Sequence, residues 1–362
     1  MMLSAGKGFI MQSEKYSRDN AGQSLKKYIL LKKGELAYNH GASKAKQYGC
    51  CYELTEDEAR IPYVYHCFKV SGTEHTPYVA TALNNPKMDR QLKRLVSSSV
   101  RMDGLLNISF DDYMSVILRL PSLKEQTHIA VFLKKLDERI TAQEKLVESL
   151  KKYKRGLISE ILNQKIRITH EDEKWEEVSL SAVADGFEYG MNAAATIFDG
   201  VHKYIRITDI DDDSHTYIDS APVSPAGVLE GKYRVRENDI LFARTGASVG
   251  KSYLYQASDG DMYFAGFLIR IHVIDGVDSG YVFLNTLTEE YNRWVALEST
   301  RSGQPGINAE QYRRYRFKLP PLETQKQISA IAQKIDAQIK RESQCLRLLQ
   351  KQEDGFLQQL FI

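Results

Sequence analysis

The sequence contains the stretch 120-LPSLKEQTHIAVFLKKLDERI-140 and, 199 residues later, the related stretch 319-LPPLETQKQISAIAQKIDAQI-339. One constant offset aligns the identical residues of both. The matches continue downstream to Gly156 and Gly355 and begin upstream at Tyr113 and Tyr312. A single register kept over about fifty positions indicates an internal duplication rather than chance similarity. The chain is therefore expected to consist of two related halves, each ending in this segment.

Both copies are expected to form long helices, because a starting proline is tolerated and the apolar residues recur at alternating steps of four and three. This 3.5-residue spacing is typical of a coiled coil. A helix of about 40 residues spans roughly 60 Å at about 1.5 Å per residue. The predicted helix–helix seam consists of Ile129, Leu133, Leu136, Ile140 and Leu150 in the first copy and Ile328, Ile335, Ile339, Leu346 and Leu349 in the second.

The residues leave the relative direction of the two helices open. Antiparallel packing about an approximate two-fold axis would bring Gln143 near Glu342. Parallel packing would instead set Lys154 beside Glu353, a pair of opposite charge that attracts.

A β-rich segment precedes each helix, with short apolar runs separated by turn residues. The stretch 235-VRENDILFARTGASVGKSY-253 resembles 31-LKKGELAYNHGASKAKQYG-49: both have a polar entry, an acid, an apolar strand and a small-residue loop with lysine. Lys44 and Lys46 stand roughly where Lys251 does. The loop at Lys251 is therefore predicted to be one instance of a repeated structural element.

The run 245-TGASVGKS-252 also invites comparison with a phosphate-binding P-loop. A P-loop needs its full glycine spacing and must open a helix whose N-terminal amides hold the phosphates. Here Thr245 occupies the place of the first glycine, and the residues after Lys251 predict a strand. We therefore predict that the loop does not bind a nucleotide.

The composition is that of an ordinary soluble protein of 362 residues, with a net charge of only +2. No apolar run approaches the ~20 residues that a membrane span needs, and the N-terminus lacks the features of a signal peptide. The four cysteines show no zinc-binding spacing, so we expect reduced thiols in a cytoplasmic protein and no metal site. Residues 168–318 contain 15 basic and 24 acidic side chains, so any nucleic-acid binding must depend on local patches.

The chain resembles the DNA specificity subunits of type I restriction–modification systems. The residues that carry the resemblance are LPSLKEQ and LPPLETQ before the two helices, NDILFARTGASVGK, YIRITDI and FLIRI. The resemblance implies an α+β fold with two β-rich target recognition domains, separated by two spacer helices that pack as an antiparallel coiled coil with pseudo-two-fold symmetry. The boundaries expected on this basis are 1–119 and 168–318 for the domains, and 120–167 and 319–362 for the helices.

The resemblance further implies a non-catalytic reader of double-stranded DNA. Each domain would read one half of a split target, and the helices would set the spacing and dock methyltransferase (modification) subunits, through which restriction subunits join. S-adenosylmethionine, ATP and Mg²⁺ would belong to those partners, with no cofactor on this chain. A rigid rod would hold two half-sites at a fixed separation, which a flexible linker would not do.

The first domain departs from the family pattern. In the second domain, Asp239, the acid that begins the predicted strand, comes 64 residues after Trp175. In the first domain, only 34 residues precede the equivalent acid, Glu35. The first domain lacks a counterpart of 175-WEEVSLSAVADG-186. Its ability to read DNA is accordingly open.

Candidate DNA contacts follow from side-chain chemistry, because arginine suits bidentate contact with guanine, whereas lysines and hydroxyls suit phosphates. Each has a structural alternative, since a loop residue can simply turn the chain and a strand arginine often pairs with a nearby aspartate. The candidates are Arg244, Thr245, Ser248, Lys251, Arg206 and Arg301 in the second domain and Asn39, Ser43, Lys44 and Lys46 in the first.

Three further features receive structural interpretations. His40 is expected to be an exposed loop side chain without a ligand role, and Asp211–Asp213 to be a solvated turn rather than a cation site. The acidic side chains of the second domain are expected to lie away from its DNA-binding face. The alternative to a DNA reader is a coiled-coil scaffold whose β-rich domains bind protein, with no nucleic-acid role.

Overall fold

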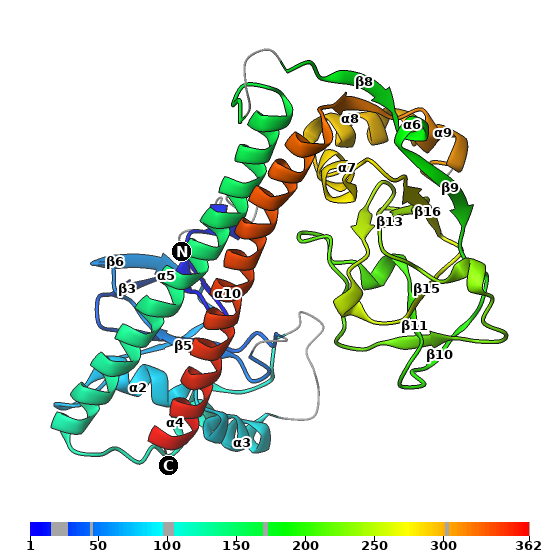
Figure 1. The fold of residues 1–362 in the computed structure, drawn as a ribbon. Helices are drawn as coiled ribbons and strands as arrows, with labels where there is room; N and C mark the ends of the chain where they lie inside the picture. Colours follow the sequence, from blue (N-terminus) through cyan, green and yellow to red (C-terminus); the bar gives the residue numbers. More distant parts are fainter. Residues whose placement is uncertain (16–27, 44–45, 97–104, 169–172, 301–303, 362) are drawn as a thin grey trace. The chain divides into compact units, whose positions relative to one another are not determined.

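The computed structural model describes residues 1–15, 28–43, 46–96, 105–168, 173–300 and 304–361. The chain forms two compact units, Met1–Lys145 with Glu342–Ile362, and Leu146–Arg341. Two long helices, α5 (Leu123–Leu162) and α10 (Leu322–Leu360), each contribute one part to both units (Figure 1). The predicted pair of long helices is therefore present.

The first unit contains a three-stranded antiparallel sheet in the order β5-β4-β7, and two separate strand pairs, β3 with β6 and β1 with β2. Three of its short helices, α2 to α4, follow the sheet in sequence. The elements are β1 (Met2–Ser4), β2 (Gly8–Ile10), α1 (Gln12–Lys15), β3 (Ile29–Lys32), β4 (Leu36–Asn39), β5 (Cys50–Glu53), β6 (Glu58–Ile61), β7 (His66–Phe68), α2 (Thr76–Leu83), α3 (Pro86–Leu95) and α4 (Phe110–Met114).

The second unit contains a four-stranded antiparallel sheet in the order β14-β13-β16-β9 and pairs β17 with β8, β10 with β12 and, in parallel, β11 with β15. Its elements are β8 (Glu176–Ser179), α6 (Leu180–Val183), β9 (Ala184–Tyr189), β10 (Ala195–Ile197), β11 (Lys203–Ile205), η2 (Ile207–Asp209), β12 (Val223–Pro225), η3 (Gly231–Tyr233), β13 (Asp239–Ala243), β14 (Ser252–Leu254), η4 (Ala257–Asp259), β15 (Met262–Phe264), β16 (Leu268–Val273), α7 (Ser279–Asn285), α8 (Glu289–Glu298), α9 (Ala309–Arg313) and β17 (Arg316–Leu319).

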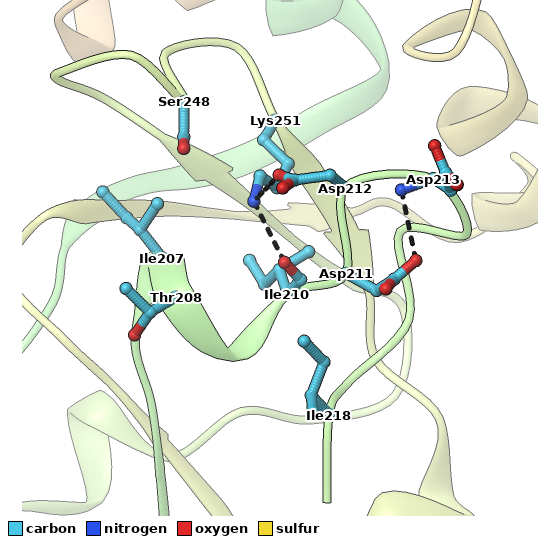
Figure 2. A pocket seen from close by; sticks show the side chains of 9 residues that line it. All are labelled: Ile207, Thr208, Ile210, Asp211, Asp212, Asp213, Ile218, Ser248 and Lys251. Carbon is cyan, nitrogen blue, oxygen red and sulfur yellow. Dashed lines mark hydrogen bonds and ion pairs between the residues drawn. The ribbon is translucent and has the colours of Figure 1, made fainter. Parts of the chain in front are cut away.

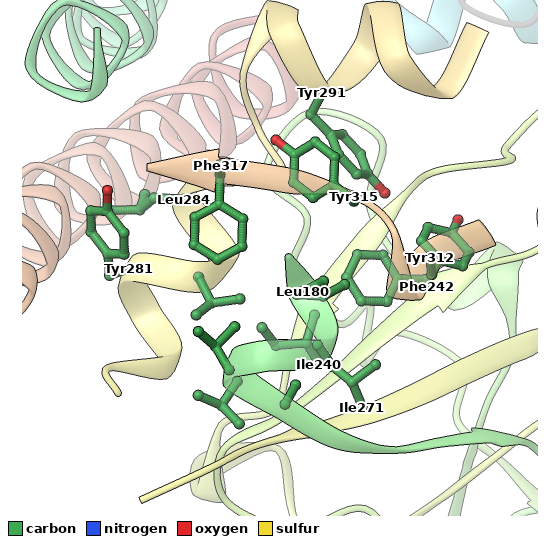
Figure 3. Close-up of a cluster of buried hydrophobic side chains, with 14 of the residues drawn as sticks. Leu180, Ile240, Phe242, Ile271, Tyr281, Leu284, Tyr291, Tyr312, Tyr315 and Phe317 are labelled. Carbon is green, nitrogen blue, oxygen red and sulfur yellow. The ribbon is translucent and has the colours of Figure 1, made fainter. Parts of the chain in front are cut away.

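An equivalent pair of aromatic rings, one from a strand and one from a short helix, lies in the core of each unit. Phe242 on β13 packs against Tyr312 on α9 with ring centroids 4.7 Å apart, in a cluster that also contains Tyr291, Tyr315 and Phe317 (Figure 3). Tyr38 on β4 stacks on Tyr113 of α4 at 3.8 Å. The repeated Tyr113 and Tyr312 are thus buried centres of equivalent cores.

The segment that the first half lacks in sequence supplies two strands of the second unit. β9 forms one edge of the four-stranded sheet, and β8 pairs with β17. In the described part of the first unit, residues 117–120 correspond to β17 but form no strand, and Ile117 is 73% exposed. The sequence difference therefore removes the partner strand of this segment and one edge strand of the sheet.

The two long helices run antiparallel. In the first unit, the Gln143 Nε2 donates to the Glu342 carboxylate at 2.8 Å. In the second unit, the Lys154 ammonium lies 2.6 Å from the Asp336 carboxylate. The parallel alternative, with Lys154 beside Glu353, is wrong. The ten residues of the predicted seam are all buried or half-buried.

The repeated glutamine of LPSLKEQ and LPPLETQ fastens each domain to its helix. Gln325 is 2% exposed, accepts the Asp278 backbone N–H at 2.9 Å and donates to the Pro320 carbonyl at 2.7 Å. Gln126 repeats both bonds, with the His75 N–H at 3.0 Å and the Pro121 carbonyl at 3.0 Å. His75 and Asp278 are the N-cap residues of α2 and α7. The motif therefore binds the start of a domain helix to the start of a long helix.

A carboxylate pair in the first unit stands where the second has a salt bridge. By the 199-residue offset, Asp137 and Glu353 correspond to Asp336 and Lys154. Glu353 is hydrogen-bonded to Asp137, and burial, followed by the contact with Asp137, raises the pKa of Glu353 to about 8. This pKa lies above that of a glutamate in the unfolded chain. Protonated Glu353 therefore contributes its full stabilisation of the fold at low pH, and this contribution is lost as the pH rises through about 8.

Replacing Glu353 by lysine is expected to stabilise the protein at pH 8 by about 1 kcal/mol, because it restores the pairing seen at Lys154 and Asp336 while water still screens the charges. Unfolding in urea at pH 5 and pH 8 measures the effect. The gain should be larger at pH 8, where Glu353 in the original protein is ionised in part beside Asp137, than at pH 5, where it is protonated. Glu353→Gln is the control that removes the charge without adding a cation. Equal stability of Glu353→Lys and the original protein at pH 8 would contradict this account.

Candidate nucleic-acid interface

The loop between β13 and β14 contains the predicted contact residues and is fastened to residues 304–307. Thr245 forms a bridge with Gly306, and the Ile307 backbone N–H donates to the Arg244 carbonyl at 2.9 Å. Gly250 has φ +88°, and an added Cβ would lie 2.6 Å from a Val295 methyl. Its glycine is therefore required by packing. β14 begins at Ser252, so a strand follows the loop, as predicted, and a P-loop is excluded.

Arg244 differs from most cations of its domain. Its guanidinium carbon lies 4.8 Å from the ring centroid of Tyr189 on β9, and Tyr189 is 43% exposed. Among the lysines and arginines of residues 184–273, Arg244 and Arg236 have no carboxylate within 4.0 Å in the part of the chain that the structure describes. Each remaining lysine or arginine of this stretch pairs with a carboxylate: Lys203–Asp219, Arg206–Asp209, Lys232–Glu230, Arg234–Asp261, Lys251–Asp212 and Arg270–Glu188.

Six acidic side chains of the second domain are thus occupied by the domain's own basic residues. A guanidinium that stacks on an aromatic ring and lacks a carboxylate retains its donors for an external acceptor. The geometry therefore separates Arg244 from Arg206, whose guanidinium makes two bonds to Asp209, at 2.8 and 2.7 Å, and whose side chain is 37% exposed.

Lys251 is held inside the domain. Its side chain is 10% exposed, and its ammonium donates to the Ile210 carbonyl at 3.0 Å and pairs with Asp212. These contacts form one wall of a pocket of about 410 Å³ that Thr208, Asp211, Asp213 and Ser248 also line (Figure 2). Lys251 thus ties the loop after β13 to the acidic turn.

The acidic turn is stabilised by local contacts. The Asp211 carboxylate accepts the backbone N–H groups of Asp213 and Ser214 at 3.1 and 2.8 Å, and these bonds lower the pKa of Asp211. Asp213 lies 3.8 Å from the Lys151 ammonium of α5. Among the residues that the structure describes, no three His, Cys, Asp or Glu side chains are arranged to hold a metal ion.

Replacing Lys251 by glutamine is expected to lower the free energy of unfolding by about 1–2 kcal/mol, because a charge-assisted contact is lost on a nearly buried side chain. The salt dependence of DNA binding should stay the same. Each phosphate contact contributes about 0.9 to the slope of log K against log salt. A slope that falls by about one would show instead that Lys251 contacts a phosphate.

The corresponding loop of the first unit repeats two backbone contacts of the Arg244 loop but carries different side chains. Gly41 bridges Leu105, and the Leu106 N–H donates to the His40 carbonyl at 2.9 Å, so His40 occupies the position of Arg244. The prediction that His40 is exposed is wrong: it is 4% exposed, and its ring nitrogens lie 2.8 Å and 2.9 Å from the carbonyls of Leu106 and Val64. The reason is that the chain at Leu106 folds back over the loop and encloses the imidazole.

The polar side chains of this loop are used within the fold. Asn39 accepts the Gly41 N–H at 2.9 Å, and Ser43 accepts the Lys46 N–H at 3.0 Å. The Lys46 ammonium donates to the carbonyl of Asn84 at 3.0 Å. Two of the predicted contacts, Lys44 and Arg301, lie outside the described residues. Sequence reasoning missed Tyr189, because an aromatic residue 55 positions from Arg244 carries no local signal of their contact.

Comparison with known proteins agrees with this architecture. Residues 172–350 match the family model of the type I restriction modification DNA specificity domain. None of the curated proteins matches the chain.

Two solved structures share the fold. One is the S subunit of a type I restriction–modification system from M. genitalium, at 13% identity and a TM-score of 0.58, covering 93% of this chain and 85% of that one. The other comes from a structural study of complex assembly and conformational transition of the type I R-M system, at 16% identity and a TM-score of 0.56, covering 92% and 82%. In the described part of the chain, no helix has the length and apolar character of a membrane span. Residues 172–350 therefore form a type I restriction modification DNA specificity domain.

Proposed function

We propose that the chain is a sequence-specific DNA-binding subunit in which each β-rich domain reads one half of a bipartite target. The domains are residues 1–119 and 168–318, and the spacer helices are residues 120–167 and 319–362. The duplicated glutamine attachment carries the proposal, because Gln126 and Gln325 bind equivalent domain helices to the starts of α5 and α10. Two domains attached in the same way to a pair of antiparallel helices suit a target of two separated parts.

In the second domain, Arg244 is the proposed base-reading residue, supported by its unpaired guanidinium and its contact with Tyr189. Thr245 and Ser248 lie in the same loop and would contact phosphates. Arg206 remains a further candidate through its partly exposed guanidinium. The chain itself would not catalyse a reaction. Methylation and ATP-driven cleavage would belong to modification and restriction subunits in the cytoplasm, which would supply S-adenosylmethionine, ATP and Mg²⁺ chemistry.

Binding of duplex DNA by the chain reconstituted with modification subunits tests this proposal. Fluorescence anisotropy over 50–400 mM KCl should show affinity that falls steeply with salt, because phosphate contacts release counterions. A duplex that contains the target should bind at least about a thousandfold more tightly than a random duplex. The scaffold alternative predicts no DNA affinity even at 50 mM KCl, and that result would refute the proposal.

A further inference from the structure

After Pro86, every exposed residue of α3 in the first unit is basic. Lys87, Arg90, Lys93 and Arg94 are all exposed, whereas Met88 and Leu92 are buried at 3% and 2%. Because successive helical residues are about 100° apart, these four cations share the side opposite the two buried residues. The cations run from Lys87 to Arg94, so they line about 10 Å of surface at about 1.5 Å per residue.

No described acidic side chain pairs with these four cations. None of them forms an ion pair within 4.0 Å with any residue that the structure describes, and the one acid on the helix, Asp89, is half-buried. Stabilisation of the helix explains only some of the pattern. Lys93 and Arg94 in the last turn favour the helix dipole, but Lys87 in the first turn opposes it.

The equivalent helix of the second unit shows that the fold does not demand this charge. The N-cap residues Asn85 and Thr288 align α3 with α8, so Met88 corresponds to the buried Tyr291. At the places of Lys87, Arg90, Lys93 and Arg94, the second unit has Glu290, Arg293, Ala296 and Leu297. With four basic residues and one acid, α3 carries a charge of +3, whereas α8, with one basic residue and three acids, carries −2.

The basic face lies next to the loop that corresponds to the Arg244 loop. Lys46, in that loop, donates to the carbonyl of Asn84, and the following Asn85 caps α3 by accepting the Lys87 N–H at 2.8 Å. The loop itself has the buried His40 where the second unit has Arg244. In the first unit, the exposed cations that the structure describes near this position are therefore on the helix.

We propose that the basic face of α3 is the surface by which the first domain contacts the phosphates of duplex DNA. This inference rests on the proposed function and adds the location of one contact surface. An acidic protein is the less suitable partner, because protein interfaces are built around apolar and aromatic anchors. No large hydrophobic side chain of α3 is exposed, whereas closely spaced lysines and arginines alone suffice for phosphate binding.

The test replaces all four cations by glutamine in the full chain (Lys87→Gln, Arg90→Gln, Lys93→Gln, Arg94→Gln), a change with little effect on helix propensity. Binding to a 30-base-pair duplex is measured as a function of KCl. Loss of four phosphate contacts should lower the slope of log K against log salt by about three to four and weaken binding at 100 mM KCl at least tenfold. Circular dichroism and thermal unfolding confirm that the variant is folded.

A matched control replaces Lys134, Lys135, Arg139 and Lys145 by glutamine. These four residues of α5 are exposed and form no ion pair among the described residues, so the control removes the same charge elsewhere in the same unit. Its slope should stay close to that of the unmodified chain.

Equal slopes for the α3 variant and the unmodified chain would overturn the inference, as would an equal loss in the α5 control. An α3 variant that binds DNA normally but no longer assembles with modification subunits would assign the surface to a protein partner and also overturn it. Failure of the unmodified chain to bind DNA, alone and with modification subunits, would instead contradict the proposed function.

Discussion

Replacing Arg244 by alanine is expected to weaken binding to the target duplex by about 1–3 kcal/mol, or roughly five- to 150-fold, with much less effect on random DNA. The guanidinium lies over the Tyr189 ring without a carboxylate partner within 4.0 Å in the described structure, so its paired donors remain free for a base edge. Arg244→Lys should not restore specificity, because an ammonium lacks the planar fork that binds two acceptors of guanine. Competition binding with the target and scrambled duplexes measures this.

Arg236→Ala is the matched control, since Arg236 is exposed and also lacks a carboxylate partner within the described residues. It should leave the ratio of target to random affinity unchanged. If Arg244→Ala lowers target and random binding equally, Arg244 contacts only the DNA backbone. If it lowers neither, the proposed role of the loop is wrong.

Replacing Gln325 by alanine is expected to cost about 2–4 kcal/mol of stability. Gln325 is 2% exposed, and its removal leaves the Asp278 N–H and the Pro320 carbonyl without their partners. Each unsatisfied buried group costs about 1–3 kcal/mol, and the missing side-chain volume adds to this cost. Urea unfolding measures the loss, and hydrogen exchange should show earlier opening at the start of α7.

Gln327→Ala provides the comparison, because Gln327 is exposed on the same helix and its loss should cost less than about 0.5 kcal/mol. Gln126→Ala should repeat the effect in the first unit at the start of α2. Similar stabilities for Gln325→Ala and Gln327→Ala would show that the repeated glutamine does not fasten the domain.

The helices and the duplication were predictable because both follow from local spacing. The proline, the glutamine and the apolar residues at steps of four and three recur with one offset, and α5 and α10 form where this pattern predicts them. The heptad seam alone did not give the helix direction, because it is compatible with both orientations, but the family resemblance implied the antiparallel packing that is found. Polar contacts of Gln143 with Glu342 and of Lys154 with Asp336 select the antiparallel one.

Only those features of the candidate site that depend on neighbouring residues in the sequence were predictable. The strand after Lys251 and the arginine at the end of β13 were both apparent in the sequence. The burial of Lys251 was not, because its acceptor Ile210 is 41 residues away. His40 was misjudged for the same reason, since the carbonyls that surround it belong to Leu106 and Val64. Contacts between distant segments decide which side chains of a loop remain available to a ligand.

The most direct measurement of the central claim is the methylation pattern of DNA in cells that express the chain with its modification subunits. Single-molecule sequencing of that DNA should show one bipartite motif with a gap of fixed length. Arg244→Ala should disturb recognition in only one half of the motif. An uninterrupted motif, or methylation that follows no motif, would contradict a chain in which two attached domains each read one half of the target.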